Sequence, residues 1–540
     1  MSMFEILPER VTYAVEESIG VEIRGLEDSG ELTIWRLGTC VKRLPCTENG
    51  TLSIGSLPSG GYGVELLVGT KLVRSAIEVS TNARSRLRYG FVTNYLPDRD
   101  LVDISDNIRR LHLNGIQFYD WAYRHANLLG GGEEYRDALG QPISLQTVRD
   151  LVTTVQRVGS NALGYAAVYA VGPQEWSDWK HDALLMGSGE PYGLGDFLFL
   201  VDPASEDWVV HFAAELKRTT EEVGFDGFHL DQYGYPKRAV RVNGVDVNVA
   251  QSFAHVIAKV RDVLPDSQLV FNNVNDFPTW VTASCPQDAI YIEVWPPQVT
   301  LDSLARVVNR ARTIGEGKPV VIAAYQHVYD VAPASGADLA TAFTMATLFS
   351  HGATQILAGE ADRILVDPYY VRNHKIEKST AELLKSWYDF LVEHDELLLN
   401  PEIVDVTGSY AGAYNNDCDV SFAEAHVTET AEAGAVWRRV TITPKQIVVH
   451  LINLVGQDDT LWDAERKVPG NPGASHLRIR RVGDHLPRVR LADPDGSPRL
   501  VEIPVRIDGD HAVAELPTLH IWQLILIDLV PTDDDSKFDD

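Results

Sequence analysis

A chain of 540 residues has room for about three domains, because single domains usually hold about 100 to 200 residues. Hydrophobic residues make up 45% of the chain and charged residues 23%, a composition that excludes intrinsic disorder and fibrous repeats. The 47 basic and 76 acidic side chains leave a formal charge of -29, which repels nucleic-acid phosphates and anionic lipid head groups. Neither nucleic acid nor a membrane is an expected partner.

The N-terminal segment carries acidic side chains where a secretory signal would need a basic region followed by an apolar one. No stretch approaches the eighteen or so consecutive apolar residues of a membrane span. We therefore expect a cytoplasmic protein, or a secreted one if a leader has been lost, and we expect a monomer. The four cysteines are too few and too scattered for a disulfide framework or a zinc site. No metal or organic cofactor is expected, because the paired-acid chemistry described below requires none.

Residues 1–85 have the pattern of a small β-domain. Short alternating runs such as VEIRGLE, ELTIWRL and YGVELLVG are separated by turns rich in glycine, serine, proline and asparagine. Alternation with a period of two is typical of strands that bury one face. We predict an antiparallel, immunoglobulin-like β-sandwich over this segment.

Residues 86–400 change to short apolar strands separated by stretches with helical spacing, which is typical of βα units around a parallel sheet. Eight such units in about 310 residues match the content of a (β/α)8 barrel. The predicted strands are YGFVTNY from Tyr89, GIQFYDW from Gly115, ALGYAAVYA from Ala162, GFHLDQY from Gly227, LVFNNV from Leu269, AIYIEVW from Ala289, VVIAAY from Val320 and TQILAG from Thr354.

Residues 401–540 return to turn-rich β-structure, as in TITPKQIVVHLINL and LHIWQLILIDLV, and we predict a second β-sandwich there. The final segment, PTDDDSKFDD, is expected to be a solvated acidic end. The predicted fold is a multidomain α/β protein with a central (β/α)8 TIM barrel between N-terminal and C-terminal β-sandwich domains.

Two carboxylates lie where a barrel places its active site, at the carboxyl ends of the strands. The predicted fourth strand ends GFHLD at Asp231, and the sixth ends AIYIE at Glu293. If the apolar residues at alternate positions pack under the helices, then both acids point into the barrel mouth, together with His229 and Tyr291.

Paired carboxylates ringed by aromatic side chains suit the cleavage of glycosidic bonds. One carboxyl protonates the leaving oxygen, the other attacks or stabilises the oxocarbenium-like carbon, and aromatic faces stack on sugar rings. Each acid alone has a plainer explanation, a helix cap or turn for Asp231 and a surface charge for Glu293. Their matching register on two strands of one barrel favours the catalytic interpretation.

Candidates for substrate binding follow the same strand ends, and each has a structural alternative. The aromatic residues of FYDWAYRH suit sugar binding or core packing, and the asparagines after the fifth strand suit substrate hydrogen bonds or a turn. His229 is either a substrate contact or a buried partner. The predicted substrate-binding residues are Asp120, Trp121, Tyr123, His125, His229, Tyr233, Asn273, Trp295 and Glu360.

Three segments, GIQFYDWAYRH, GFDGFHLDQYGYP and IYIEVWP, occur in this order and together resemble the motifs of glycoside hydrolase family 66. This is the family of dextranases and cycloisomaltooligosaccharide glucanotransferases. The resemblance implies a retaining mechanism on α-1,6-linked glucan or isomaltooligosaccharide, with Asp231 as nucleophile and Glu293 as general acid/base. It also implies that Asp120 and the neighbouring aromatic residues line the substrate cleft.

The dextranase type is favoured over the glucanotransferase type. Members that make cyclic products typically carry an extra carbohydrate-binding module inserted into the barrel, and only about fifteen residues separate the seventh strand from the next helical stretch, AFTMATLFS. We therefore predict an endo-acting hydrolase. The alternatives are a cycloisomaltooligosaccharide glucanotransferase, another α-glucan hydrolase of the barrel type, and a non-catalytic carbohydrate-binding protein.

Overall fold

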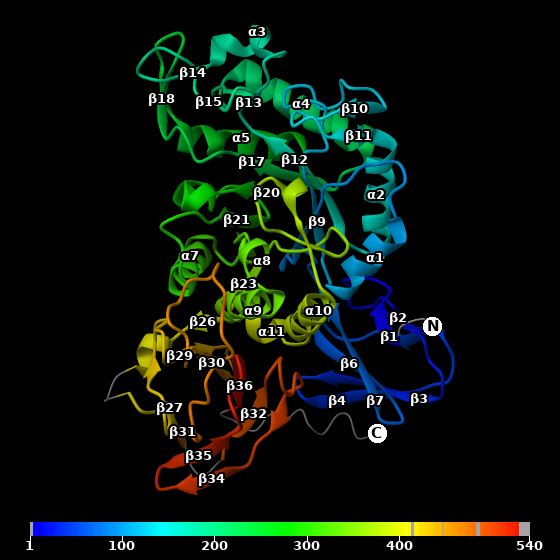
Figure 1. Ribbon diagram of the computed structural model, residues 1–540, viewed down its shortest axis with the longest axis vertical. Helices are drawn as coiled ribbons and strands as arrows, with labels where there is room; N and C mark the ends of the chain where they lie inside the picture. Colours follow the sequence, from blue (N-terminus) through cyan, green and yellow to red (C-terminus); the bar gives the residue numbers. More distant parts are fainter. Residues whose placement is uncertain (1–3, 412–414, 445, 482–485, 529–540) are drawn as a thin grey trace.

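The computed structural model describes residues 4–411, 415–444, 446–481 and 486–528. The chain forms a barrel with two groups of antiparallel sheets beneath it, the N-terminal sheets in blue and the C-terminal sheets in yellow to red (Figure 1). The predicted acidic end at 531–540 lies outside the described residues. This arrangement is the predicted multidomain α/β fold.

The N-terminal part consists of two antiparallel sheets that enclose a small apolar core. One sheet has three strands in the order β1-β2-β5 and the other has four in the order β4-β3-β6-β7. Alternate residues of the central strands supply this core, such as Ile19, Val21 and Ile23, as the alternating runs in the sequence predicted. The strands are β1 (Glu5–Pro8), β2 (Ile19–Arg24), β3 (Gly30–Arg36), β4 (Thr39–Cys46), β5 (Gly50–Gly55), β6 (Gly60–Val68) and β7 (Lys71–Val79).

Eight parallel strands form the barrel, in chain order around the sheet, and each coincides with a strand predicted from the sequence. The first and last strands approach each other where the Phe91 amide donates to the carbonyl of Ala358 at 3.2 Å, so the sheet is nearly closed. The strands are β8 (Tyr89–Val92), β9 (Gly115–Phe118), β12 (Asn161–Ala167), β17 (Gly227–Asp231), β20 (Gln268–Asn272), β21 (Ala289–Glu293), β22 (Val320–Ala323) and β23 (Ala353–Gln355).

A helix follows each barrel strand, although the helix after β20 is a single turn. The long helices, except α9, bury one stripe against the strands, as amphipathic helices of a barrel do. They are α1 (Leu101–Arg110), α2 (Leu145–Arg157), α4 (Glu206–Val223), α5 (Val249–Val263), α7 (Leu301–Ile314), α9 (Ala334–His351) and α10 (Lys378–Glu393). The short helices are α3 (Trp176–Trp179), η1 (Lys180–Asp182), η2 (Val274–Asp276), α6 (Thr279–Thr282), α8 (Val328–Val331), η3 (Tyr370–Arg372), α11 (Asp395–Leu398) and η4 (Thr407–Tyr410).

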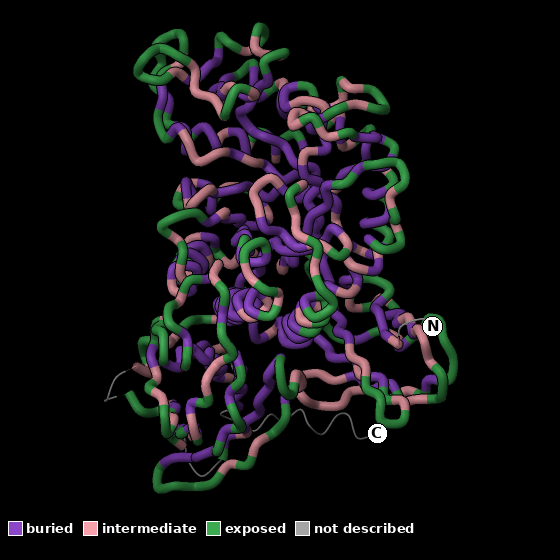
Figure 2. Tube along the Cα trace, viewed as in Figure 1, coloured by how far each residue is buried: buried purple, intermediate pink, exposed green. Residues whose placement is uncertain are grey.

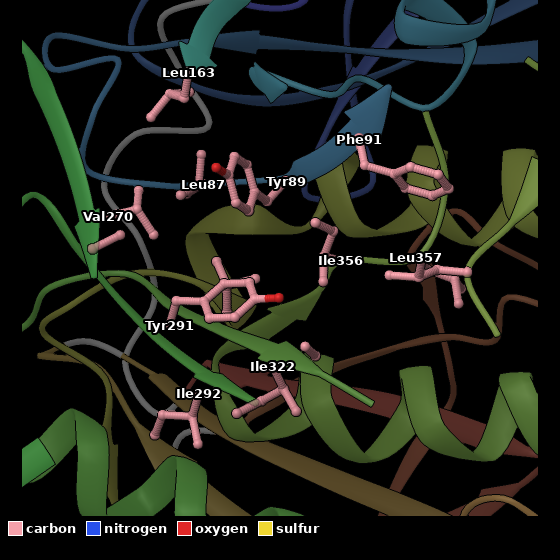
Figure 3. Packing of buried hydrophobic residues seen from close by; sticks show 14 of the residues in the cluster. Leu87, Tyr89, Phe91, Leu163, Val270, Tyr291, Ile292, Ile322, Ile356 and Leu357 are labelled. Carbon is pink, nitrogen blue, oxygen red and sulfur yellow. The ribbon is translucent and has the colours of Figure 1, made fainter. Parts of the chain in front are cut away.

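Side chains from several strands fill the barrel, among them the edge-to-face pair Tyr89 and Tyr291, whose ring centroids are 6.2 Å apart (Figure 3). Close strand packing explains the glycine that opens β17. A Cβ atom on Gly227 would lie 1.9 Å from the carbonyl oxygen of Gln268 on the neighbouring strand. A larger residue would force these two strands apart.

Short strands after the barrel strands cover the end of the barrel that holds the two acids. The longest connection predicted in the barrel, between β12 and α4, folds into a small sheet of its own, and its strand β14 pairs with the hairpin that follows β17. These short strands are β10 (Glu134–Arg136), β11 (Pro142–Ser144), β13 (Ala170–Val171), β14 (Leu184–Leu185), β15 (Gly193–Leu194), β16 (Leu198–Leu200), β18 (Arg238–Arg241), β19 (Asp246–Asn248), β24 (Arg363–Ile364) and β25 (His374–Lys375).

Two further sheets form the C-terminal part, one built around the order β26-β29-β30-β36-β32-β33 and one with the order β27-β31-β35-β34. The first of these sheets lies against α9 and α10, where Trp522 packs on Phe390 at 5.1 Å. The strands are β26 (Val404–Asp405), β27 (Cys418–Phe422), β28 (Val427–Thr428), β29 (Val436–Ile442), β30 (Gln446–Asn453), β31 (Ser475–Arg480), β32 (Arg488–Ala492), β33 (Val501–Glu502), β34 (Val505–Asp508), β35 (His511–Leu516) and β36 (Trp522–Asp528).

Because the C-terminal sheet covers its outer face, α9 is buried on nearly all sides, and the buried purple tube continues from the barrel into the sheet below it (Figure 2).

The four cysteines, Cys40, Cys46, Cys285 and Cys418, are free thiols. Among the described helices, none combines the length and apolar character that a membrane crossing requires.

Candidate active site

Asp231 and Glu293 are the last residues of β17 and β21, at the carboxyl ends of two barrel strands. Between these strands, the inward alternation predicted from the sequence is present. The ring of His229 lies 4.7 Å from that of Tyr291 inside the barrel. Ile290 faces outward, because a Cβ atom on Gly315 at the end of α7 would lie 2.3 Å from its side chain.

The side-chain amide of Asn272, the last residue of β20, connects the two acids. Its Nδ2 atom donates to Asp231 Oδ1 at 2.7 Å and to Glu293 Oε2 at 3.0 Å. These two carboxylate oxygens can therefore be no further apart than the sum of the two distances, 5.7 Å. The opposite orientation of the amide would turn its oxygen toward two carboxylates, so the hydrogen-bond network fixes the orientation.

Each acid has a tyrosine of its own. The Tyr165 hydroxyl donates to Asp231 Oδ2 at 2.6 Å, and the Tyr325 hydroxyl donates to Glu293 Oε1 at 2.8 Å. Hydrogen bonds to a carboxylate favour its ionised form, whereas burial favours the neutral form. At both acids the two effects oppose each other.

The two carboxyls differ in their pKa. Burial, followed by the charge of Asp231, raises the pKa of Glu293 to about 7, against the hydrogen bonds from Asn272 and Tyr325. Burial also raises the pKa of Asp231, and the hydrogen bonds from Tyr165 and Asn272 oppose it. Glu293 can therefore hold its proton much closer to neutral pH than a solvated glutamate can. The pair thus combines a proton donor with a carboxylate held by two donors.

The acids lie in a cavity of about 330 Å³ with mostly aromatic walls. Tyr119 and Tyr370 stack with centroids 4.3 Å apart, and the Tyr370 hydroxyl lies 2.9 Å from that of Tyr291. Amphipathic rings around a polar centre suit a ligand with apolar faces and many hydroxyls, such as a sugar. The lining residues are Gln117, Tyr119, Tyr165, Leu194, His229, Asp231, Gln232, Tyr233, Tyr235, Asn272, Tyr291, Glu293, Trp295, Tyr325, Pro368, Tyr369 and Tyr370.

Five of the residues predicted for the site line this cavity: Asp231, Glu293, His229, Tyr233 and Trp295. His229 is neutral, since burial lowers its pKa to about 3, and it shares a 3.3 Å hydrogen bond with the Tyr89 hydroxyl. Trp295 stands at the edge of the cavity with 38% of its surface exposed.

Three residues of the predicted FYDWAYRH cluster lie elsewhere. Trp121 is fully buried and its indole donates to the carbonyl of Tyr165 at 3.2 Å, so it belongs to the core. The Tyr123 ring packs beneath the guanidinium of Arg124 at 4.2 Å, outside the cavity. His125 is also buried, and burial followed by the charge of Arg124 lowers its pKa to about 4.

Asp120 lies close to the cavity but is not part of its lining. Its backbone has a positive φ of 44°, which turns the chain after β9 and sends the following residues into the core. Burial, followed by the charges of Asp137 and Asp231, raises its pKa well above the usual value. Asp120 is therefore close enough to Asp231 for their charges to interact.

Asn273 and Glu360 do not line the cavity, and their side chains bind other parts of the fold. The Asn273 amide donates to the carbonyls of Phe271 and Tyr291, and its oxygen accepts from the hydroxyl of Thr282 at 2.5 Å. Its hydrogen-bonding capacity is used within the fold.

Glu360 accepts from the amides of Thr93 at 2.8 Å and Asn94 at 3.4 Å and forms an ion pair with Arg99. It fastens the loop after β8, and its carboxylate does not line the cavity.

Among the cavity residues that the prediction left out are Tyr165, Asn272, Tyr325 and the Pro368–Tyr370 segment. Tyr165 and Asn272 follow from the alternation that identified the acids, since Asn272 occupies the same inward position on β20 that Asp231 occupies on β17. Tyr325 lies two residues beyond the end of β22. The segment after β23 had no such signal, because it belongs to an irregular loop. Among the described residues, no group of His, Cys, Asp and Glu could hold a metal ion.

A parallel barrel with two carboxylates that share one amide donor among aromatic walls is the arrangement of a carbohydrate-active barrel enzyme. The sequence model of glycosyl hydrolase family 66 matches residues 50–526, so the chain belongs to this family. This membership agrees with the three motifs in the sequence.

The relatives that match this chain in sequence carry two names. The chain is 25% identical over 304 residues, half of its own length, to a cycloisomaltooligosaccharide glucanotransferase of Niallia circulans, and 23% identical over 392 residues, 59% of its length, to a dextranase of Streptococcus salivarius. It spans 31% and 47% of the length of these relatives.

The fold is similar to that of a solved structure, a Paenibacillus cycloisomaltooligosaccharide glucanotransferase in complex with cycloisomaltoheptaose. The TM-score is 0.87 at 18% identity, with 97% of this chain and all of that chain covered. At this identity the likeness concerns the fold.

Proposed function

We propose that the protein is a retaining endo-hydrolase of α-1,6-glucosidic linkages in dextran or isomaltooligosaccharides, with Asp231 as nucleophile and Glu293 as general acid/base. The observation that carries the proposal is the Asn272 amide shared by both acids. It limits the distance between Asp231 Oδ1 and Glu293 Oε2 to 5.7 Å. Retaining enzymes hold their carboxyls about 5 to 5.5 Å apart, whereas inverting enzymes need about 6.5 to 9.5 Å to admit a water. The linkage follows from the names of the relatives.

The first chemical step forms a covalent glucosyl-enzyme. An oxygen of Asp231 attacks the anomeric carbon as the bond to the glycosidic oxygen breaks, and Glu293 gives its proton to that oxygen. The raised pKa of Glu293 keeps this proton available near neutral pH. Asp231 has lost its charge in the ester, and Glu293 has gained one.

The second step reverses the roles. Glu293, now ionised, removes a proton from a water molecule that attacks the anomeric carbon, and Asp231 leaves as a carboxylate. Asn272 can donate to whichever acid is charged, so the negative charge keeps one amide donor in both steps. The product keeps the configuration of the substrate.

A cycloisomaltooligosaccharide glucanotransferase is the second candidate, and the name of the Paenibacillus structure with the high TM-score favours it. Against it, β22 ends at Ala323 and α9 begins at Ala334, which leaves no room for an inserted module between them. The long connection after β12 folds into short strands over the barrel and contributes Leu194 to the cavity wall. Without an additional module that binds a long glucan chain, water should reach the glucosyl-enzyme before the far end of that chain does.

Digestion of dextran with mass spectrometry of the products tests this proposal. We expect linear isomaltose-type oligosaccharides, and no release of sugar from starch. A dominant series one water lighter than the linear products would mean cyclisation and would support the second candidate. Inactivity on dextran and on isomaltooligosaccharides alike would contradict both.

A further inference from the structure

A segment of the C-terminal domain reaches back to the active-site end of the barrel. Residues 457–468, which we call the arm, belong to the connection between β30 and β31, and Figure 1 shows this part of the chain in orange, rising from the lower sheets toward α7. Nothing in the chemistry proposed above uses the arm.

The arm binds the backbone of the loop that carries Trp295. Leu461 forms an antiparallel bridge with Thr300, and the amide of Leu301 donates to the carbonyl of Thr460 at 2.8 Å. The indole of Trp462, which is only 7% exposed, donates to the carbonyl of Gln298 at 2.8 Å. These contacts lie three to six residues after Trp295.

The same arm binds the loop that carries Tyr325. The amide of Val328, three residues after Tyr325, donates to Asp463 Oδ1 at 2.8 Å. The amide of Arg466 donates to the carbonyl of Gly336 at 3.2 Å. One segment of the C-terminal domain therefore fastens two barrel loops.

The arm is itself held in shape from within. The buried guanidinium of Arg466 donates to the carbonyl of Asp459 at 2.9 Å and to its carboxylate at 2.5 Å. The Gln457 amide donates to the carbonyl of Lys467 at 2.8 Å, which closes the base of the arm. Because these hydrogen bonds lie within the arm, the arm can act as a rigid element that fixes the position of the loops it contacts.

The two fastened loops form one side of the cavity. Tyr325 donates to Glu293, and the Trp295 ring lies 6.0 Å from the Tyr325 ring. A general acid faces the leaving part of the substrate, and later the group that attacks the intermediate. Tyr325 binds Oε1 of Glu293, whereas Asn272, which also binds Asp231, holds Oε2. We therefore place the leaving glucan and the incoming acceptor against this side of the cavity. We call Trp295 and Tyr325 the acceptor wall.

We propose that the arm positions the acceptor wall and thereby sets how the glucosyl-enzyme divides between water and a sugar acceptor. The inference rests on the retaining mechanism proposed above and adds the part of the chain that controls its outcome. A well-placed aromatic face holds an acceptor sugar long enough to compete with water, whereas a loosened face does not. The arm residues are positioning residues, since none of them lines the cavity.

Asp463→Ala removes one hydrogen bond from the arm, and Trp295→Ala removes the wall itself. Asp463→Asn keeps an oxygen acceptor for the Val328 amide and serves as the conservative variant. Asp458→Ala is the matched control, because Asp458 lies on the same arm, is exposed, and among the described residues forms its ion pair with the exposed Lys467.

Each variant is incubated with an aryl isomaltoside and added isomaltose, and transfer products are compared with hydrolysis products. We expect the transfer-to-hydrolysis ratio to fall about 3- to 10-fold in Asp463→Ala, the effect of one hydrogen bond, and further in Trp295→Ala. The ratio should be restored in Asp463→Asn and unchanged in Asp458→Ala. Release of the aryl group in Asp463→Ala should change less than about twofold, because a phenolate is a good leaving group and departs with little help from Glu293 or the acceptor wall.

Two results would overturn the inference. A ratio that falls in Trp295→Ala but stays constant in Asp463→Ala and in Arg466→Lys would make the arm a fastening without influence on the reaction. A ratio that is constant in Trp295→Ala would remove the acceptor wall. Failure of the proposed function is separate, since the unaltered protein would then release no aryl group at all.

Discussion

Each of the two carboxylates has its own tyrosine partner, Tyr165 for Asp231 and Tyr325 for Glu293. Each hydroxyl donates to one acid, whereas Asn272 donates to both. The tyrosines therefore allow the two pKa values to be changed one at a time. Glu293 acts as an acid only while it holds its proton, so activity is lost as the pH rises through its pKa of about 7.

Tyr325→Phe should move the alkaline limb of the pH profile upward. The lost hydrogen bond stabilised the ionised form of Glu293, so its pKa rises and the protonated acid persists to higher pH. Tyr165→Phe is the matched control and should move the acid limb upward, because Asp231 loses a donor. The measurement is kcat/KM against pH. An alkaline limb that stays in place in Tyr325→Phe would contradict the assignment of Glu293 as the acid.

Strand alternation predicts that Asp231 and Glu293 face the inside of the barrel, and both line the cavity, because a strand in a barrel has only two faces. The same rule fails one residue beyond the strand. Asn273 follows the end of β20 and turns into the fold, while Asn272 on the strand reaches both acids. The positive φ of Asp120 has the same effect after β9, since it sends Trp121 into the core. Backbone turns of this kind leave little trace in the sequence.

Helix α9 illustrates the element scale. Its sequence, ASGADLATAFTMATLFSH, has one charged residue near its start and no polar stripe beyond small hydroxyl side chains. A helix without a polar face is buried on all sides. The cause lies in the other domain, because the C-terminal sheet covers the outer face that a barrel helix normally exposes, with Trp437 against His351 at 5.2 Å.

Ala346→Glu in α9 should therefore destabilise the protein strongly. Ala346 is fully buried, and an unpaired carboxylate at this position costs several kcal/mol, on the order of 3 to 5. Val210→Glu is the matched control in α4, where the side chain is 59% exposed and the expected change is within about 0.5 kcal/mol. Urea unfolding measures both. Equal stability of the two variants would show that α9 tolerates solvent.

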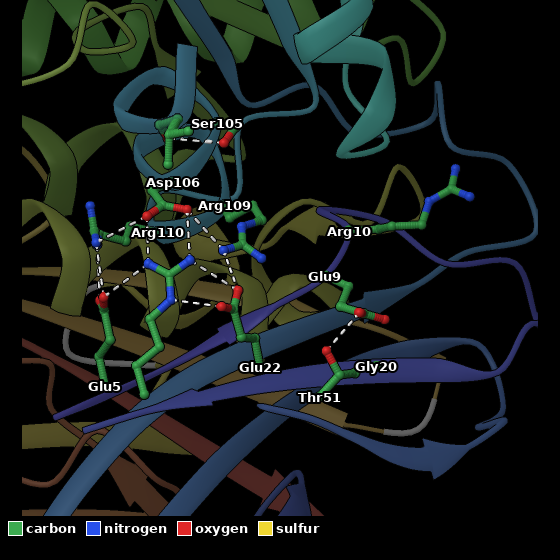
Figure 4. A network of polar contacts seen from close by, with 12 residues as sticks. Glu5, Glu9, Arg10, Gly20, Glu22, Thr51, Ser105, Asp106, Arg109 and Arg110 are labelled. Atoms are coloured by element: carbon green, nitrogen blue, oxygen red, sulfur yellow. Dashed lines mark hydrogen bonds and ion pairs between the residues drawn. The ribbon is translucent and has the colours of Figure 1, made fainter. Parts of the chain in front are cut away.

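The whole molecule is held together by polar contacts between its parts as well as by apolar ones. Figure 4 shows such a network between the N-terminal strands and α1, with Glu5, Glu22, Asp106, Arg109 and Arg110. Arg110 donates to Glu5 at 2.9 Å, and Arg109 donates to Glu22 at 2.7 Å. Two of these acids belong to the first sheet, so the network joins it to the barrel.

Arg24→Ala should weaken this junction. The Arg24 guanidinium donates to Glu22 at 2.8 Å and to Asp106 at 3.1 Å, and its loss leaves two acids with fewer partners. We expect the free energy of unfolding to fall by about 1 to 3 kcal/mol, less at high salt. Lys71→Ala, which removes an exposed pair with Glu27, should change it by less than about 0.5 kcal/mol. Equal effects of both variants would contradict the role of the network.

The length and the β-rich flanks predict three domains, but they do not predict the contacts between these parts of the chain. A sequence pattern shows which residues are buried and leaves open which partner buries them. The arm is an example, since residues 457–468 are rich in charged and polar side chains, and nothing in that composition predicts their contacts with two barrel loops.

The central claim is the division of roles between Asp231 and Glu293, and rescue by azide tests it most directly. In Asp231→Gly, azide should take the place of the missing nucleophile and give a glycosyl azide of inverted configuration. In Glu293→Ala, azide should attack the glucosyl-enzyme and give an azide of retained configuration. Proton NMR of the two anomeric products is the measurement. Opposite anomers from the two variants are the predicted result, and the same anomer from both would contradict the account.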